Sequence, residues 1–239
     1  MKIDSEKCTG CSMCVKWCPC GAMFVVDRKV RIDWDECTEC GVCRRVNACP
    51  VGAIYQQPLE WPRSVRAVYS DPLNIHKETG LAGRGTEETK TNDVTNRFKR
   101  GEIGIAIEVG RPKVGAKLRE LERFSIALAE KGIAFEPCNP LTKLIDATTG
   151  KLPVEILDEK VISAIIEFTV PEKEFISTLN LIKEVAQNSK TVISVDAAVR
   201  AAEDGSWPTI RYLDEAGYYY RPNCKTNVGL GKLLPSKEA

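Results

Sequence analysis

The pattern of apolar and polar positions is most regular in the second half of the chain. Four stretches alternate in the manner of strands: Ile103 to Val109, Ile133 to Phe135, Val161 to Val170 and Ile193 to Val199. Two stretches repeat apolar residues at helical spacing: Val114 to Leu128, ended by Gly132, and Phe175 to Ala186, begun by Pro171. These predicted elements follow one another as β-α-β-β-α-β.

This order predicts an α+β fold for residues 102–200. It suits a split-βαβ, ferredoxin-like sandwich, in which two helices cover one face of an antiparallel sheet. The layout resembles that of small regulatory domains of the ACT type and of the NIL domain. Because one topology serves many activities, this resemblance alone assigns no function.

Two segments outside this domain lack regular periodicity. Residues 58–101 read as an extended connector, with apolar side chains such as Trp61 and Tyr69 that we expect to pack on a domain. Residues 201–239 read as an aromatic, turn-rich tail. The tail either wraps the second domain or forms a surface that docks a larger enzyme.

A polar run from Gly83 to Thr95 and two isolated cysteines are weaker candidates for a ligand or redox site. The run contains no P-loop sequence, and a solvated linker is the reading we favour over an anion site. Both cysteines stand in loops beside proline and asparagine, where isolated packing is the alternative to a redox pair. The candidate residues are Arg84, Thr86, Lys90, Asn92, Cys138 and Cys224.

The clearest candidate for a chemical site is an internal repeat of cysteines in the first fifty residues. Isoleucine and aspartate precede three cysteines spaced two residues apart, and the whole pattern recurs 29 residues later. Each half closes on Cys-Pro, and the second half is two residues longer before its closing cysteine. The eight repeated cysteines are Cys8, Cys11, Cys14, Cys18, Cys37, Cys40, Cys43 and Cys49.

Residues 1–57 therefore resemble the bacterial two-cluster ferredoxin family, in which the last cysteine of each run binds the other [4Fe–4S] cluster. The resemblance implies two crossed ligand sets: Cys8, Cys11, Cys14 and Cys49 for the first cluster, and Cys37, Cys40, Cys43 and Cys18 for the second. The alternative is structural zinc, which also uses Cys-x2-Cys pairs. Two triplets that both close on Cys-Pro favour iron–sulfur clusters over zinc.

Three further features of this region carry expectations. Cys20 aligns with Val51 of the other half, so we expect it to pack as a small apolar residue. The longer loop at residues 44–48 departs from the ferredoxin pattern and is expected to alter the docking face or the potential of the second cluster. Met23 to Ile32 reads as a hairpin whose side with Phe24 and Val26 shields cluster sulfurs from water.

Net charge and composition limit the kinds of partner and metal site that we expect. The chain has 34 Lys and Arg against 33 Asp and Glu, which gives no reason to expect nucleic acid or an anionic membrane as partner. With 11 cysteines and no signal peptide, we expect a cytoplasmic protein in a reducing, anaerobic host. The single histidine, His76, excludes a multi-histidine zinc site within this chain.

Three functions fit these observations. The first is an electron-transfer protein or subunit that feeds a partner reductase, because no catalytic motif accompanies the clusters. The second follows from GRGTEETKTNDV, IEVGRP and TNVGLG, which resemble the iron–sulfur portion of 6-hydroxynicotinate reductase. That resemblance implies reduction of a heteroaromatic substrate with a separate flavin-containing subunit. The third is a cluster-linked ligand sensor or sulfur-metabolism accessory protein with an ACT/NIL-like domain.

Overall fold

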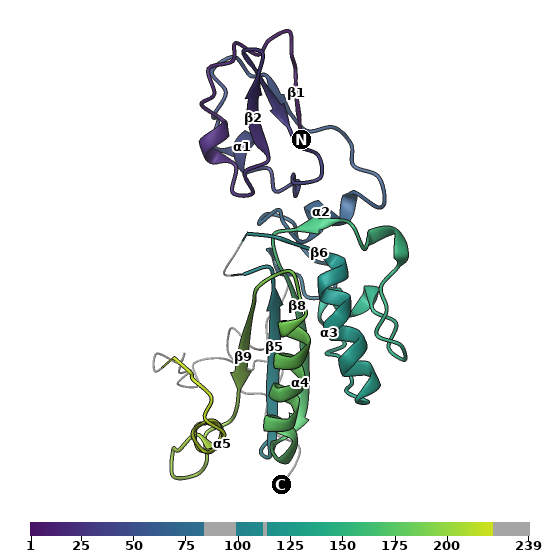
Figure 1. Ribbon diagram of the computed structural model, residues 1–239, viewed down its shortest axis with the longest axis vertical. Helices are drawn as coiled ribbons and strands as arrows, with labels where there is room; N and C mark the ends of the chain where they lie inside the picture. Colours follow the sequence, from purple (N-terminus) through teal and green to yellow (C-terminus); the bar gives the residue numbers. More distant parts are fainter. Residues whose placement is uncertain (84–98, 112–113, 222–239) are drawn as a thin grey trace.

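The computed structural model describes residues 1–83, 99–111 and 114–221. The N-terminal module contains two small antiparallel sheets, one pairing β1 with β4 and the other pairing β2 with β3. Its elements are β1 (Lys2–Ile3), η1 (Val15–Trp17), β2 (Met23–Val26), β3 (Lys29–Ile32), α1 (Val42–Arg45) and β4 (Ile54–Tyr55). Figure 1 shows this module at one end of the molecule, beyond α2 (Ser64–Val68).

The rest of the described chain is a mixed domain of α+β type. Its strands are β5 (Glu102–Val109), β6 (Ala116–Lys117), β7 (Lys160–Val161), β8 (Ala164–Pro171) and β9 (Ile193–Ala198). Its helices are α3 (Leu118–Glu130), α4 (Phe175–Gln187) and α5 (Pro208–Glu215), with short 3-10 turns η2 (Pro140–Leu144), η3 (Val154–Ile156) and η4 (Glu172–Glu174).

The main sheet has the order β8-β5-β9, with both pairings antiparallel. In this register Ile105 of β5 lies between Phe168 of β8 and Ala197 of β9. The predicted strand at 133–135 is reduced to one antiparallel bridge, between Phe135 and Phe168 at the free edge of β8. A single bridge suffices there because Phe135 is held mainly by burial of its ring in the core.

The prediction of one continuous strand from Val161 to Val170 was wrong. The chain divides there into β7, which pairs with β6, and β8, which pairs with β5. At the break, the amide of Ile162 donates to the hydroxyl of Ser70 at 2.9 Å, and its carbonyl accepts from the amide of Gly115 at 3.1 Å. These bonds turn the backbone away from the main sheet and toward α2.

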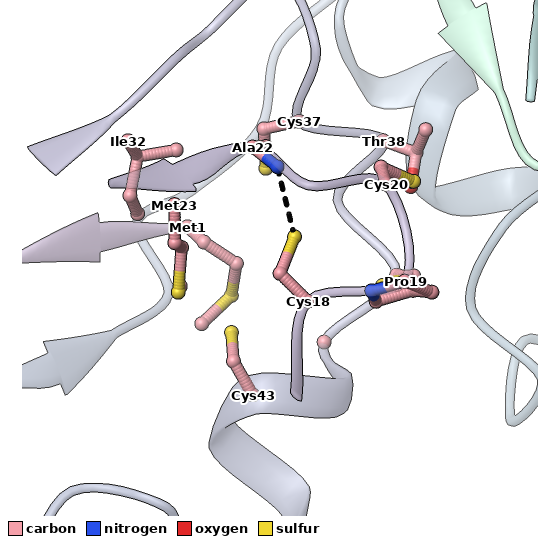
Figure 2. A pocket seen from close by; sticks show the side chains of 12 residues that line it. Met1, Cys18, Pro19, Cys20, Ala22, Met23, Ile32, Cys37, Thr38 and Cys43 are labelled. Carbon is pink, nitrogen blue, oxygen red and sulfur yellow. Dashed lines mark hydrogen bonds between the residues drawn. The ribbon is translucent and has the colours of Figure 1, made fainter. Parts of the chain in front are cut away.

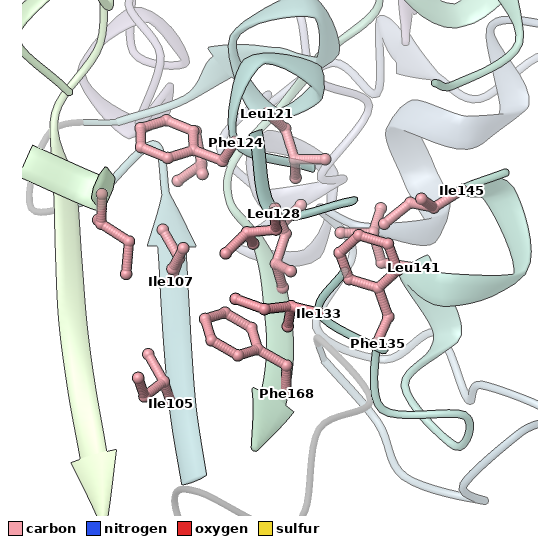
Figure 3. Packing of buried hydrophobic residues seen from close by; sticks show 14 of the residues in the cluster. Ile105, Ile107, Leu121, Phe124, Leu128, Ile133, Phe135, Leu141, Ile145 and Phe168 are labelled. Carbon is pink, nitrogen blue, oxygen red and sulfur yellow. The ribbon is translucent and has the colours of Figure 1, made fainter. Parts of the chain in front are cut away.

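One apolar core lies between the main sheet and the helices α3 and α4. Figure 3 shows Ile105 and Ile107 of β5 facing side chains of α3 such as Phe124. The side chains of Ile105, Ile107 and Phe124 are almost fully buried. The helix α3 ends as the sequence predicts, because Gly132 takes a φ of 76° that continues no right-handed helix.

The connector is less extended than predicted. Residues 64–68 form α2, and Val65 and Tyr69 belong to the core of the second domain. A helix forms here because it turns both apolar side chains, four positions apart, to the same side. Further along, the described part of the tail, residues 201–221, contacts its own domain, since the hydroxyl of Tyr218 donates to Asn180 of α4 at 2.7 Å.

The hairpin of β2 and β3 turns at Asp27 and Arg28, which both have positive φ. The expectation that Phe24 and Val26 shield the cluster sites was wrong, because both side chains are exposed. Met23 and Val30 form the buried side instead. The register explains the difference: Met23 pairs with Ile32, and this end of the hairpin packs inside the module.

Candidate metal centres

The two halves of the cysteine-rich region are joined by reciprocal hydrogen bonds. The amide of Asp4 donates to the carbonyl of Ala53 at 2.8 Å, and the amide of Asp33 donates to the carbonyl of Ala22 at 2.7 Å. Ala22 and Ala53 follow the closing cysteines of the first and second halves. Each half therefore binds the segment that follows the last cysteine of the other half.

The repeated aspartates shape the turn that leads to each cysteine triplet. The carboxylate of Asp4 accepts from the amides two and three positions later at 3.0 and 3.3 Å, and that of Asp33 does so at 2.9 and 3.2 Å. The backbone carbonyls of both aspartates accept from the amides of Cys8 and Cys37, each at 3.0 Å. Asx turns of this kind explain why Ile-Asp recurs at the same distance before both triplets.

The loops between the cysteines use left-handed backbone at matching positions. These positions are Gly10, Ser12 and Gly21 in the first half and Glu39, Gly41 and Gly52 in the second. At Gly10 a Cβ atom would lie 2.0 Å from the carbonyl oxygen of Arg28, so only glycine fits without movement of the hairpin. The matching position Glu39 keeps this backbone shape with a full side chain.

The eight cysteines line two separate cavities of similar size. One cavity, of about 310 Å³ including its open mouth, is lined by Cys18, Cys37, Cys40 and Cys43 and also by Cys20. The other, of about 290 Å³ measured in the same way, is lined by Cys8, Cys11, Cys14 and Cys49. In each cavity the cysteine triplet of one half meets the closing cysteine of the other half, and Cys20 is an additional cysteine in the larger cavity. The structure thus brings together the two crossed sets that the sequence indicates.

The arrangement of these sulfurs distinguishes between metal sites. Within the described ranges, no three His, Cys, Asp or Glu side chains converge closely enough to hold one metal ion. Structural zinc needs four sulfurs about 2.3 Å from a single point. Four cysteines around a cavity, three of them on one tight loop, instead suit a body with several metal atoms and one thiolate at each corner. Thiolates arranged in this way are the ligands that a cubane uses.

Hydrogen bonds to sulfur repeat in the two halves as well. The amide of Ala22 donates to the sulfur of Cys18 at 3.2 Å, and the amide of Ala53 donates to the sulfur of Cys49 at 3.2 Å. Figure 2 shows the first of these bonds beside Cys43 and Met23. Donors of this kind stabilise a thiolate and tune the potential of a metal centre that it binds.

The local surroundings shift the pKa values of the cysteine thiols in different directions. A hydrogen bond from the amide of Val30 lowers the pKa of Cys8. Burial raises the pKa of Cys43 to about 12 and also raises the pKa of Cys37 and Cys14. Burial therefore disfavours the thiolate form of Cys14, Cys37 and Cys43.

Cys20 differs from the eight repeated cysteines. Its sulfur lies 3.4 Å from the hydroxyl of Thr38, and Figure 2 shows the two side by side, away from Cys18 and Cys43. Burial raises the pKa of its thiol to about 11, against the opposing effect of the Thr38 hydroxyl. This side chain is half-buried and lines the same cavity as Cys18, Cys37, Cys40 and Cys43. Its role as a packing residue stays a prediction.

Sequence reasoning missed the charged side chains around the second cavity. Glu39 is buried between the N-terminal amine of Met1 and the guanidinium of Arg63, which also lies over the ring of Trp34. Burial alone would raise the pKa of Glu39, but these two cations outweigh it and hold the pKa below its usual value. The signal that could have revealed this role is a glutamate at a position where the other half has Gly10.

The longer loop of the second half supplies Arg45. Its guanidinium donates to the carbonyl of Cys40 and, at 2.8 Å, to the carboxylate of Asp71, which follows α2. In the first half, the carbonyl of Cys8 accepts from the ammonium of Lys29. The two extra residues thus make room for an arginine that reaches from a cysteine loop to the connector.

The weaker candidate site is described only at Cys138. The amide of Cys138 donates to the carboxylate of Glu136 at 3.0 Å, and the next residue, Asn139, is buried with hydrogen bonds to Ile165 and Glu167. This loop is therefore anchored to β8. The other candidates lie outside the described residues: Arg84, Thr86, Lys90, Asn92 and Cys224.

His76 has a structural environment. It is buried, its ring lies 5.6 Å from that of Tyr69, and its Nε2 is 2.9 Å from the carbonyl oxygen of Gly83. These contacts join the end of the connector to α2.

Comparison with known proteins adds no relative. No family model, curated protein or solved structure matches the chain. Among the described residues, no helix has the length and apolar character needed to cross a bilayer.

Proposed function

We propose that residues 1–57 hold two [4Fe–4S] clusters and that the protein transfers single electrons to a partner reductase. The observation that carries this proposal is the pair of matched cavities, in each of which the cysteine triplet of one half meets the closing cysteine of the other. Neither a disulfide framework nor a single-ion site accounts for this crossed pattern. When bound, such a cluster supplies reversible storage of one electron, usually at low potential.

The chain contributes ligands, hydrogen bonds and shielding. The first site uses Cys8, Cys11, Cys14 and Cys49, and the second uses Cys18, Cys37, Cys40 and Cys43. Backbone amides donate hydrogen bonds to the sulfurs of the closing cysteines in both sites. Met23 and Val30 keep water from the inner side of the cavities, and a drier site raises the cost of added negative charge.

The second domain is proposed to be a split-βαβ domain of the ferredoxin-like type. Its support is the β8-β5-β9 order, the bridge at Phe135 beyond β8, and the two helices that follow β5 and β8 in the chain. Phe135 then stands in the place of the remaining edge strand. We propose that this domain attaches the electron carrier to a larger reductase with a flavin-containing subunit, in the reducing cytoplasm of an anaerobe.

The electron balance needs two partners. A low-potential donor protein loses one electron, and the acceptor subunit gains it, so the carrier returns to its starting state after each transfer. No bond within the chain forms or breaks in this cycle. The cysteines remain thiolate ligands throughout, and the burial of Cys37 and Cys43 protects them from release as free thiols.

Anaerobic reconstitution with iron and sulfide tests the proposal. We expect about eight irons per chain, a broad visible absorption that bleaches with dithionite, and the paramagnetic signal of a reduced cubane. Cys14→Ala removes one proposed ligand and should lower iron toward half or prevent folding. Cys20→Ala is the matched control, since it removes a thiol of the same module without removing a ligand, and should keep about eight irons.

The same preparation can contradict the proposal. Binding of zinc in preference to iron, with no visible absorption after reconstitution, would show that the cavities do not hold cubanes. Complete loss of iron in Cys20→Ala, with Cys14→Ala unaffected, would overturn the ligand assignment.

A further inference from the structure

The second cavity, unlike the first, is held by a side chain from α2. Arg66 is only 4% exposed, and its Nη1 donates to three backbone carbonyls of the loop that ends at Cys37. The distances are 2.9 Å to Trp34, 2.9 Å to Asp35 and 2.8 Å to Cys37. One buried guanidinium therefore fixes the backbone of a proposed ligand.

The other side of the same guanidinium is tied to the second domain. The Nε of Arg66 pairs with the carboxylate of Glu159, next to β7. A second ion pair, between Lys160 of β7 and Glu36, joins the 34–37 loop directly to β7. In addition, Ser70 accepts the amide of Ile162 at 2.9 Å, just beyond β7. The loop before Cys37 is thus fastened to α2 and to the β7 edge.

The internal repeat gives a direct comparison for this arrangement. The carbonyl of Cys8, which matches that of Cys37, accepts from Lys29, a residue of the same hairpin module. Cys11 is exposed, whereas the matching Cys40 is buried. The two sites therefore share a ligand pattern but differ in the exposure of one cysteine and in the groups around them, since the loop before Cys37 is linked to α2 and β7 and the carbonyl of Cys8 is bonded within its own module.

The charges of Arg66 and Glu159 determine the expected effect on the reduction potential of the proposed cluster. A reduced cluster carries one more negative charge than an oxidised one, so a nearby cation favours reduction and a nearby anion opposes it. Screening by water is weak for a buried group such as Arg66. Arg66 favours the reduced state, and Glu159 offsets part of that effect.

We propose that Arg66 is a positioning residue that couples the second domain to the Cys18, Cys37, Cys40 and Cys43 site alone, by fixing the 34–37 loop and raising the reduction potential of the cluster held there. This inference rests on the proposed function. It makes the two sites unequal: the potential of one depends on the position of α2 and β7, and the potential of the other does not.

A redox titration of the full chain, followed by visible absorption and by the paramagnetic signal, tests the inference. Two one-electron waves are expected. Arg66→Met should shift one wave to lower potential, and Lys29→Met, the matched variant of the first half, should shift the other wave to lower potential. Glu159→Gln should shift the Arg66-sensitive wave to higher potential, because it removes the anion and keeps the cation.

Arg66→Lys separates charge from geometry. It keeps the positive charge but cannot donate to three carbonyls and a carboxylate at once. We expect a smaller shift than in Arg66→Met, together with faster hydrogen exchange of the amides in residues 34–37. A role confined to stability would change exchange or iron retention without moving one wave in opposite directions in the Met and Gln variants.

The outcomes distinguish this inference from the proposed function. If the unaltered chain takes up no iron, the proposed function fails. If it takes up about eight irons and neither Glu159→Gln nor Arg66→Lys moves a wave, the coupling fails while the proposed function stands. Arg66→Met and Lys29→Met shifting the same wave would also overturn it. If Arg66→Met does not fold, the Glu159→Gln and Arg66→Lys variants still decide the matter.

Discussion

Gly10 offers the sharpest test of the loop geometry around the first cavity. Its φ is 72°, and a Cβ atom would lie 2.0 Å from the carbonyl oxygen of Arg28, on the turn of the hairpin. Gly21 has a similar φ of 66°, but a Cβ atom there meets nothing within 4 Å. Alanine at either position therefore takes the same backbone penalty, and only at Gly10 does it also collide with backbone.

The cost can be estimated from these two terms. An alanine in left-handed backbone costs about 1–2 kcal/mol, and this applies to both variants. Forcing a packed backbone aside adds about 1–3 kcal/mol for Gly10→Ala only. About 1.4 kcal/mol corresponds to a factor of ten in an equilibrium constant. The unfolding equilibrium constant of Gly10→Ala should therefore exceed that of Gly21→Ala by roughly one order of magnitude or more.

Rates of cluster loss provide the assay, since metal-loaded proteins of this kind rarely unfold reversibly. Both variants are reconstituted anaerobically and mixed with a chelator, and the decay of visible absorption is followed. We expect Gly21→Ala to decay slightly faster than the unaltered chain, and Gly10→Ala to decay about ten times faster than Gly21→Ala. Equal decay rates for the two variants would refute the argument from the Arg28 contact.

Two further predictions concern the rest of the molecule. Asn139→Ala removes hydrogen bonds of 2.7 Å to Glu167 and 3.1 Å to Ile165 and the hydrogen bond that caps the amide of Leu141. It should lower the free energy of unfolding by about 2–4 kcal/mol, measured by denaturant titration of the near-ultraviolet signal. The control is Asn188→Ala, which removes an exposed side-chain hydrogen bond at the end of α4 and should lower that free energy by well under about 1 kcal/mol. Removing iron with a chelator should leave amides of β5 and β8 protected from hydrogen exchange while those of residues 1–57 exchange freely, because metal binding supplies folding energy only to the module; exchange of both regions together would contradict two separate cores.

The regular elements of the second domain were largely predictable from periodicity. Strands β5 and β9 lie where the apolar spacing indicates, and so do the bodies of helices α3 and α4, since each buries one face against a common core. The predicted helix starts were wrong: α3 begins at Leu118 and not at Val114, because Ala116 and Lys117 pair with β7, and α4 begins at Phe175, because Pro171 ends β8. The division of the strand near Ile162 was not predictable in this way. Its cause is a hydrogen bond to Ser70, a residue 92 positions earlier, and such long-range bonds leave no local pattern.

The same contrast holds for the candidate sites. Cysteine spacing predicts the two triplets, because three thiolates two residues apart lie on one small loop, whereas the crossing of the closing cysteines is what the resemblance to two-cluster ferredoxins implies. The roles of Glu39, Arg45 and Arg66 could not be predicted, because each depends on a partner brought close by folding. Helix α2 was missed for a related reason: its five residues are too few to show a period, and its burial of Val65 and Tyr69 is a tertiary effect.

The reciprocal bonds between Asp4 and Ala53 and between Asp33 and Ala22 also bear on how the module can be taken apart. Each half donates one backbone bond and one cysteine to its counterpart and receives the same in return. Neither half is therefore a smaller version of the whole: alone, each would lack the closing cysteine that the other half brings to its cavity and would have one backbone carbonyl without its donor. The dependence is mutual. A cut at the Asp27–Arg28 turn would separate two fragments, each of which needs the other to complete its cavity and its backbone hydrogen bonds.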